Sequence, residues 1–337
     1  MKQFKVAVVG ALGAVGSEML KTLEQRTFPV SEIVPLDAAV NRGKTIVFRG
    51  REAVVKTAEQ GAFTGVDIAL FSAGGDASLA LAPVAVKEGA LVVDNSNAWR
   101  MDPEVPLVVP EVNPEDLDKQ NGIIANPNCS TIQMLVALKP LHDNFVIKRI
   151  VVSTYQAISG AGGAAIREMT DQAKAWVEGR SISNKVFPRR ILFNLIPQID
   201  VFLENDYTKE EMKMVNETKK ILDPAVKVCA TAVRAPVFRG HAESINIETE
   251  KPMDVEKVRE LLSKAPGVVV MDDPGRLIYP TPLDAEGGDK VFVGRIRKDE
   301  TVENGLNLWV TADNLRKGAA LNAVQIAEVM ISGGILA

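Results

Sequence analysis

Four short apolar runs, separated by segments with a helical pattern, fill the first third of this 337-residue chain. The runs lie at 6–9, 33–36, 68–71 and 91–93, and each ends in small or polar residues. Continuous apolar runs that alternate with helices are typical of a parallel sheet covered by helices. The pattern therefore predicts an α/β fold for this part of the chain.

A glycine-rich turn follows the first apolar run and opens a helix. Glycines let the backbone approach a pyrophosphate, and a helix N-terminus favours the anion. The spacing is G-x-x-G-x-x-G and differs from the usual G-x-G-x-x-G, so the position after the first strand supports the assignment. We therefore predict a Rossmann-like dinucleotide-binding domain whose cofactor contacts include Gly10, Leu12, Gly13, Ala14, Val15 and Gly16.

The second apolar run ends at Asp37, followed by Ala38. An acidic residue about 20 positions beyond such a loop hydrogen-bonds the ribose of NAD and would repel the 2′-phosphate of NADP. Arg42 and Lys44 are close enough in sequence to offset that charge. A second glycine-rich turn ends the third run, and we expect it to pack against the cofactor through Ser72, Ala73, Gly74 and Gly75.

The pattern changes near residue 128, where longer and more mixed strands begin. We expect a dinucleotide-binding domain over 1–128 plus about 314–337, and an α+β domain with a mixed sheet over 129–313. Strands are predicted at 150–156, 226–233, 242–248, 291–297 and 306–311. Helices are predicted from the Gly-rich turn at 159–163 to about 179, at 207–222, at 254–264 and, as an amphipathic helix, at 314–330.

Composition narrows the class of protein. The chain is 46% hydrophobic and 24% charged with a net charge of −4, which gives no indication of a nucleic-acid or membrane partner. It has only two cysteines, too few for a disulfide framework, and the start of the chain leads directly into a strand pattern. We therefore expect a cytoplasmic protein.

Cys129 lies where an apolar run turns into a helix. A helix N-terminus favours the thiolate and can hold an oxyanion, so Cys129 is a candidate nucleophile, although most free cysteines are simply small buried hydrophobes. Cys229 lies inside a strand pattern and is predicted to be core. Of the two histidines, His241 at a strand start is the candidate acid/base near neutral pH, and His142 ends a helix. No metal site is evident.

Several motifs occur in an order that resembles the aspartate-β-semialdehyde dehydrogenase family: the loop at 10–16, 71–75, 94–96 with 100–102, 126–131, 153–156, 240–241 and the tail at 309–328. The resemblance implies reversible reductive dephosphorylation of L-4-aspartyl phosphate to L-aspartate 4-semialdehyde through a cysteine thioester. That reaction serves lysine, threonine, methionine and isoleucine biosynthesis. The resemblance also implies a small-molecule substrate, inorganic phosphate, and a homodimer or homotetramer formed through the second domain's sheet.

The resemblance also implies residue roles. Cys129, His241 and Gln156 would be catalytic, and Gly160 would contact the cofactor. The expected substrate-binding residues are Arg100, Asn128, Glu210, Lys213 and Arg234. Glu210 and Lys213 are three apart on one predicted helix, so a solvated ion pair is the alternative, and the neighbouring Glu211 competes with Glu210.

The family's usual cofactor is NADP, held by a Ser and an Arg after the second strand. This chain has Ala38 and Val40 at those places with Asp37 beside them, so NAD or dual use is also open. Two other functions share the thiolate or the loop: a related acyl-phosphate reductase such as N-acetyl-glutamyl-phosphate reductase, and a non-catalytic NAD(P)-sensing module.

Overall fold

The computed structural model describes residues 2–336. The chain forms two compact units, one made of residues up to Asn128 together with those from Ala319 onward, the other of Cys129–Gly318. The chain therefore passes between the units after Asn128 and after Gly318, whereas the sequence pattern puts the second passage near residue 314.

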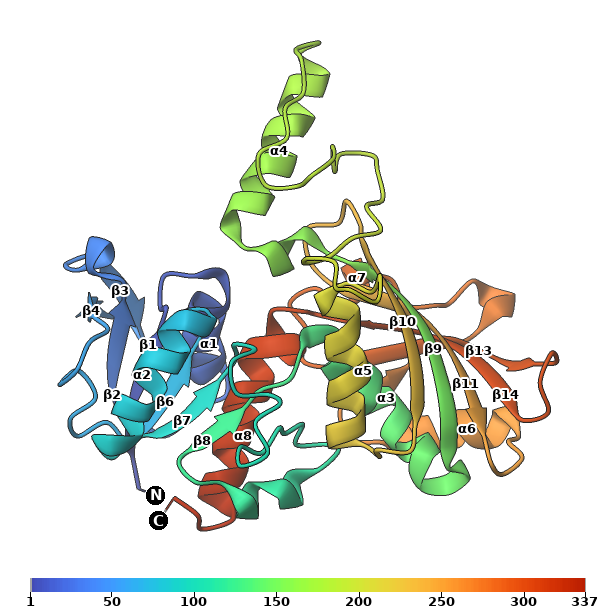
Figure 1. Cartoon of the computed structure of the whole chain (residues 1–337), viewed down its shortest axis with the longest axis horizontal. Coiled ribbons are helices and arrows are strands. Elements are labelled where there is room, and N and C mark those ends of the chain that lie inside the picture. Colours follow the sequence, from blue (N-terminus) through green and yellow to red (C-terminus); the bar gives the residue numbers. More distant parts are fainter. Residues whose placement is uncertain (1, 337) are drawn as a thin grey trace. The chain divides into compact units, whose positions relative to one another are not determined.

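The first unit contains a six-stranded parallel sheet in the order β5-β2-β1-β6-β7-β8 (Figure 1). All four predicted apolar runs are strands of this sheet, which confirms the predicted fold class. The strands are β1 (Phe4–Val9), β2 (Val30–Asp37), β5 (Lys56–Thr57), β6 (Ile68–Phe71), β7 (Leu91–Asp94) and β8 (Ile123–Ala125). The hairpin β3 (Thr45–Phe48) and β4 (Arg51–Val54) forms a separate small sheet. The helices are α1 (Ala14–Gln25), α2 (Gly75–Lys87) and α8 (Leu321–Ser332).

The core of this unit packs strand residues such as Val6 and Leu70 against α1 and α8. Helix α8 contributes Val324 and Met330 and is buried along most of its length. The prediction of an amphipathic helix at 314–330 was therefore wrong in two respects. The chain first makes a π-helical turn at Arg316–Ala320, and the α-helix that follows is a core helix.

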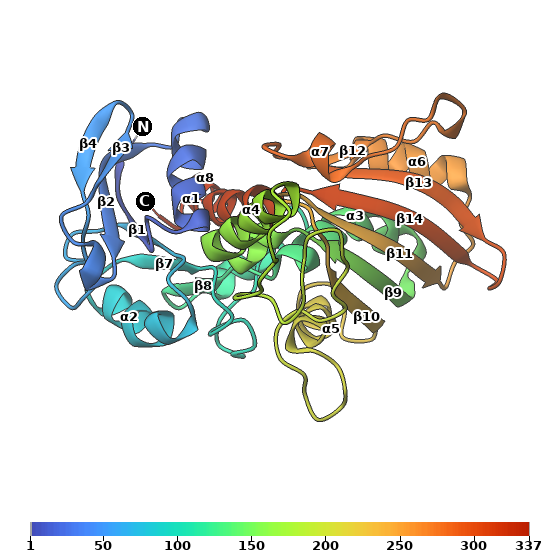
Figure 2. The ribbon, with the colours of Figure 1, turned by 90° about the horizontal axis from the view of Figure 1, so that it is seen from above.

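The second unit contains a mixed six-stranded sheet in the order β10-β9-β11-β14-β13-β12, which Figure 2 shows from above. The predicted mixed sheet is thereby confirmed. Helix α3 packs on β9, β11, β13 and β14 and also contacts α5 and α6, so these three helices share one face. The strands are β9 (Ile147–Gln156), β10 (Lys227–Arg234), β11 (His241–Thr249), β12 (Val268–Val270), β13 (Val291–Asp299) and β14 (Gly305–Ala312). The helices are α3 (Cys129–Phe145), α4 (Gly163–Val177), α5 (Lys209–Ile221), α6 (Val255–Lys264) and the short α7 (Pro282–Ala285).

Helix α4 stands away from this sheet (Figure 1). The loop that returns from it is fastened by two buried side chains on α4. Glu168 accepts backbone N–H groups from Lys185 and Val186, and Gln172 accepts the Leu192 N–H at 3.1 Å. Satisfying these loop donors with side chains gives the projecting segment a defined path.

Cys229 is exposed on the edge strand β10, so its assignment to the core was wrong. Side chains alternate along a strand, and the neighbouring Ala230 and Ala232 take the buried positions. The Cys229 sulfur instead lies 3.7 Å from the Tyr207 hydroxyl. Cys229 lies in the middle of a strand, whereas Cys129 begins a helix and contacts an imidazole.

Candidate active site

Cys129 is the first residue of α3. The dipole at this end of a helix favours a thiolate. The sulfur lies 3.2 Å from Nε2 of His241, although the two residues are far apart in sequence. Gly318 presses against the same cysteine, since a Cβ on Gly318 would lie only 2.8 Å from the Cys129 Cβ. The candidate nucleophile therefore lies between the His241 side chain and the Gly318 backbone.

His241 begins β11 and is completely buried. Its Nδ1 accepts the backbone N–H of Ala157 at 3.0 Å. Burial, assisted by the positive charge of Arg234 and opposed by Glu210, lowers the pKa of His241 to about 3. The imidazole is therefore neutral at neutral pH, in contrast to the near-neutral titration expected from the sequence.

Gln156 ends β9 beside this histidine. Its side-chain oxygen accepts the Thr154 hydroxyl at 3.1 Å, and its Nε2 donates to Glu210 at 3.1 Å. These two contacts fix which end of the amide is oxygen and which is nitrogen. Gln156 is thus a buried amide with its donor end directed at Glu210 and His241.

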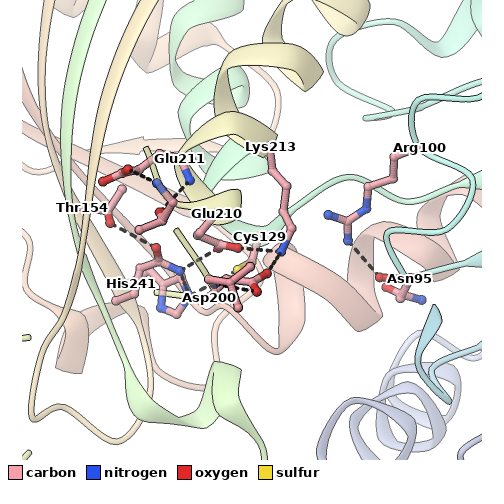
Figure 3. Close-up of polar contacts among 12 residues, drawn as sticks. Asn95, Arg100, Cys129, Thr154, Asp200, Glu210, Glu211, Lys213 and His241 are labelled. Carbon is pink, nitrogen blue, oxygen red and sulfur yellow. Dashed lines mark hydrogen bonds and ion pairs between the residues drawn. The ribbon is translucent and has the colours of Figure 1, made fainter. Parts of the chain in front are cut away.

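Glu210 and Lys213 form an ion pair at 2.9 Å on α5, and Lys213 also reaches Asp200 at 3.0 Å (Figure 3). Glu210 is only 5% exposed, so the alternative of a solvated helix face does not describe it. Burial would lower the pKa of Lys213, but the charges and hydrogen bonds of Glu210 and Asp200 raise it overall. The lysine therefore remains a cation.

Glu211, the rival of Glu210, is already used within the fold. It forms a capping box with Thr208 at the start of α5 and also accepts the Ala232 N–H at 2.9 Å. The Thr208-x-x-Glu211 spacing is visible in the sequence and would have separated the two glutamates. The structure directs Glu210 toward Gln156 and Glu211 toward the backbone.

Arg234 ends β10 and is 6% exposed. It donates to the Ala157 carbonyl at 2.7 Å, and it is close enough to Glu210 and Cys129 to interact with their charges. Burial nevertheless lowers the pKa of Arg234 below its ordinary value. A Cβ on Gly160 would meet Arg234 at 3.3 Å and His241 at 3.6 Å, which places this glycine against the same cluster.

Two predicted substrate-binding residues belong to the first unit. Asn128 immediately precedes α3 and is buried. Arg100 is also buried and donates to the Asn95 carbonyl at 2.9 Å. Its loop is anchored by Asp94, which accepts the Ser96 hydroxyl at 2.5 Å and the Ser78 hydroxyl.

The glycine-rich loop of the first unit lines a cavity of about 450 Å³ at the carboxyl ends of β1, β2 and β6. This edge of a parallel sheet is where dinucleotides bind. Of the predicted cofactor residues, the cavity is lined by Gly10, Leu12, Gly13, Asp37, Ala38, Ser72 and Ala73. Ala14, Val15, Gly16, Gly74 and Gly75 lie in the adjoining starts of α1 and α2, and Arg42 is not part of the lining.

Two features of this loop suit a pyrophosphate. Gly10 has φ +81°, and a Cβ there would lie 2.4 Å from the Ser72 carbonyl oxygen, so only glycine fits. Gly13 caps α1 without a side-chain hydrogen bond, which leaves the helix N–H groups available to an anion. A dinucleotide cofactor therefore fits the residues that are present.

Asp37 is held by three donors: Leu12 N–H at 3.0 Å, Ala38 N–H at 2.8 Å and the Asn41 amide at 2.8 Å. Burial would raise the pKa of Asp37, but these hydrogen bonds and the charge of Lys44 lower it below its ordinary value. The cavity is thus bordered by a fixed carboxylate at the end of β2.

Sequence reasoning missed several members of both sites. Thr154 could have been found, because it is two residues before Gln156 on the same strand face. Asp200, the Ala157 backbone and Gly318 had no signal, since each is brought in by tertiary folding. In the cavity the missed residues are Val9, Asn41, Ala58, Ala77 and Leu81.

His142 lies in the last turn of α3, where Nδ1 accepts the Ile147 N–H at 3.3 Å and Nε2 lies 3.6 Å from Asp223. Residues 2–336 contain no group of three histidine, cysteine or acidic side chains arranged for a metal ion. Within the same range, every helix is too short or too polar to cross a bilayer.

Comparison with known proteins gives a consistent result. Two family models match: "Semialdehyde dehydrogenase, NAD binding domain" over residues 5–120 and "Semialdehyde dehydrogenase, dimerisation domain" over 138–317. The chain is 57% identical to the aspartate-semialdehyde dehydrogenase of Aquifex aeolicus over 99% of both chains. It is 53% identical to that of Bacillus subtilis over 96% of both.

Solved structures agree. Aspartate semialdehyde dehydrogenase II of Vibrio cholerae, complexed with ASA, superposes with a TM-score of 0.96 at 49% identity over 98% of this chain and 99% of that one. The Candida albicans enzyme with NADP gives 0.78 at 26% identity over 99% and 100%. With two matching domains and relatives that are 57% and 53% identical over almost their whole length, the chain belongs to the aspartate-semialdehyde dehydrogenase family.

Proposed function

We propose that this NAD(P)-dependent oxidoreductase converts L-4-aspartyl phosphate and L-aspartate 4-semialdehyde into one another through a thioester on Cys129. The proposal depends mainly on one observation. Cys129 is the first residue of α3, and its sulfur lies 3.2 Å from Nε2 of His241. A nucleophile activated in this way splits acyl transfer into two easier steps. In the aspartate pathway the product feeds lysine, threonine, methionine and isoleucine biosynthesis.

In the reductive direction the Cys129 thiolate attacks the acyl carbon, and phosphate leaves with the electrons of the broken bond. The thioester carbon then receives a hydride, and the carbon–sulfur bond breaks to release the aldehyde and restore the thiolate. NAD(P)H supplies the hydride when bound. We assign the carbonyl oxygen to Gln156 and His241, because His241 contacts the sulfur and Gln156 lies beside His241.

The charged side chains suit the substrate. We assign Arg234 to the α-carboxylate, since a guanidinium can form paired hydrogen bonds with a carboxylate. Glu210 is assigned to the substrate ammonium, and Lys213 with Arg100 to the phosphate. Asn128, next to the nucleophile in sequence, is assigned to the same substrate. In these assignments each charged group of the substrate meets a residue of opposite charge. One anionic residue binds its ammonium, and three cationic residues bind its carboxylate and phosphate.

We infer that NAD is preferred over NADP. The Asp37 carboxylate is ionised and fixed at the edge of the cavity, and the adjacent Ala38 has no hydroxyl with which to hold a 2′-phosphate. Val40 is 83% exposed at the place where the family resemblance implies an arginine. Lys44 donates to Asn41 at 2.6 Å and its positive charge acts on Asp37, which makes dual use the competing outcome.

We propose a homodimer formed through the sheet of the second unit. Its face opposite α3 presents the half-buried aromatic pair Tyr155 and Trp309, whose ring centroids lie 5.6 Å apart. Aromatic residues that are half covered in one chain are enriched at interfaces. Light scattering on purified protein distinguishes a dimer from a tetramer. A cytoplasmic location is also proposed, in keeping with two free cysteines.

The test is a spectrophotometric assay with aspartate semialdehyde, phosphate and either NAD⁺ or NADP⁺. We expect cofactor reduction that requires phosphate, is lost in Cys129→Ala and is retained in the matched control Cys229→Ala. Activity that persists in Cys129→Ala would exclude the covalent route. Reduction of the cofactor with N-acetyl-glutamate semialdehyde but not with aspartate semialdehyde would favour the related reductase. Binding of the cofactor without any turnover would favour a sensing module.

A further inference from the structure

The two ring nitrogens of His241 have different hydrogen-bond partners. The partner of Nδ1 determines which of the two nitrogens carries the ring hydrogen. The Ala157 backbone N–H points at Nδ1 at 3.0 Å. A backbone N–H can only donate, and a neutral imidazole has one acceptor nitrogen. Nδ1 must therefore be the unprotonated nitrogen, and the ring hydrogen lies on Nε2.

Nε2 is the nitrogen that faces Cys129, at 3.2 Å from the sulfur. The other neighbour, Nε2 of Gln156, is 3.4 Å away and is itself a donor, because Thr154 and Glu210 fix the amide orientation. Two donors do not bond to each other. The hydrogen on His241 Nε2 is therefore directed at the sulfur, which accepts it.

The same surroundings oppose a second proton on the ring. Protonated Nδ1 would place its hydrogen against the Ala157 N–H. Arg234 on β10 adds a repelling positive charge, and the ring is fully buried. Glu210 on α5 is the group that favours the charged ring, and it is already paired with Lys213.

We propose that His241 serves the reaction as a neutral hydrogen-bond donor through Nε2, first to the Cys129 thiolate and then to the oxygen of the attacked carbonyl, and that it does not remove the Cys129 proton. This rests on the proposed thioester route and specifies the role of one residue in it. A neutral imidazole that polarises a carbonyl is an established kind of catalyst.

The proton balance of the reaction allows this role. The thiolate adds to the acyl carbon and gives an oxyanion, which reforms the carbonyl as the bond to phosphate breaks. Hydride from NAD(P)H gives a second oxyanion, which reforms the carbonyl as the carbon–sulfur bond breaks and the thiolate returns. Neither step needs a proton on sulfur or on the ring, and the one proton consumed overall is taken up by the released phosphate.

The test uses the fact that the chain has only two histidines. Full-length protein in a His142→Asn background, labelled with ¹⁵N-histidine, gives nitrogen signals from His241 alone. We expect a protonated-type signal for Nε2 and an unprotonated-type signal for Nδ1, both unchanged from pH 6 to pH 9. A protonated Nδ1, or an imidazolium signature within that range, would overturn the proposal. Loss of activity in Cys129→Ala tests the thioester route separately, so the two failures are distinguishable.

Discussion

The cysteine site and the dinucleotide cavity are formed by different kinds of structural feature. The cysteine site brings together buried side chains from α3, α5, β9, β10 and β11. The protonation states of its side chains depend on their burial and on the charges next to them. The cavity is built from the glycine loop, helix N-termini and one carboxylate at the ends of three strands. Changes in the first site should therefore affect the rate, whereas changes in the second should affect which cofactor is used.

The largest effect is expected at Gly318, which contacts the nucleophile through its missing side chain. Gly318→Ala places a Cβ 2.8 Å from the Cys129 Cβ, so the cysteine must move. A displacement of about 1 Å at a reacting group can cost on the order of 100-fold in rate. We expect kcat to fall by that order while NAD⁺ binding, measured by calorimetry, stays the same.

Gly163→Ala is the matched control, because an added Cβ there meets only the end of the Arg167 side chain at 3.4 Å. If Gly318→Ala kept the wild-type kcat, the close approach to Cys129 would have no catalytic importance.

Glu210→Gln should give the next largest effect. The substitution removes a buried carboxylate that binds both Gln156 and Lys213. Hydrogen bonds to charged groups contribute about 1.5–3 kcal/mol, so we expect kcat/KM for aspartate semialdehyde to fall by roughly 10–100-fold. Glu260→Gln, on the exposed surface of α6, is the control. Equal kinetics for both variants would remove Glu210 from the substrate site.

Asp37→Ser tests the other region. Removing the fixed carboxylate should raise kcat/KM with NADP⁺ relative to NAD⁺ by about 10-fold or more, because two like charges about 4 Å apart repel by ~1 kcal/mol in water and by ~4 kcal/mol near a protein surface. The rate at which iodoacetamide modifies Cys129 should not change. An unaltered cofactor ratio would show that Asp37 does not discriminate between the two cofactors.

The smallest effect on activity is expected for Glu243, where the change concerns stability. Glu243 is fully buried on β11, and burial raises its pKa well above the ordinary value of 4.5, although Gln133 and Ser130 of α3 partly offset this. A carboxyl that stays protonated in the native state stabilises the fold fully below pH 4.5, and this contribution declines as pH rises toward the native pKa. The decline is limited to about 1.4 kcal/mol per pH unit.

Glu243→Gln removes that titration and keeps a neutral side chain of the same size. We expect urea unfolding to show a stability advantage of the variant over wild type that grows from pH 5 upward. A difference that is constant with pH would mean that Glu243 is ionised in the native protein.

The contrast between the regions also explains how far the sequence could be interpreted. The dinucleotide loop and its strands were predicted because their residues are adjacent in the chain. Cys129 and His241 could be chosen as candidates from local context, but their separation of 3.2 Å and the low pKa of His241 could not be predicted. Burial of His241 comes from elements far apart in sequence, and although Arg234 is close to His241 in the chain, the sequence does not show that its charge acts on the imidazole.

Two errors share a physical origin. Cys229 and its neighbour Ala230 differ by one position on a strand, and the composition of an edge strand does not reveal which face is buried. The π-helical turn before α8 likewise has no local sequence signal, although Gly318 within it is the residue that lies against Cys129. Such irregular helical turns often occur at functional sites.

The central claim is the covalent bond to Cys129. Enzyme mixed with aspartate semialdehyde and NAD⁺ without phosphate, quenched in acid and digested, should contain an acyl adduct on the peptide that carries Cys129, and phosphate should remove it. Turnover on addition of phosphate, with no adduct or with an adduct only on the Cys229 peptide, would contradict the account.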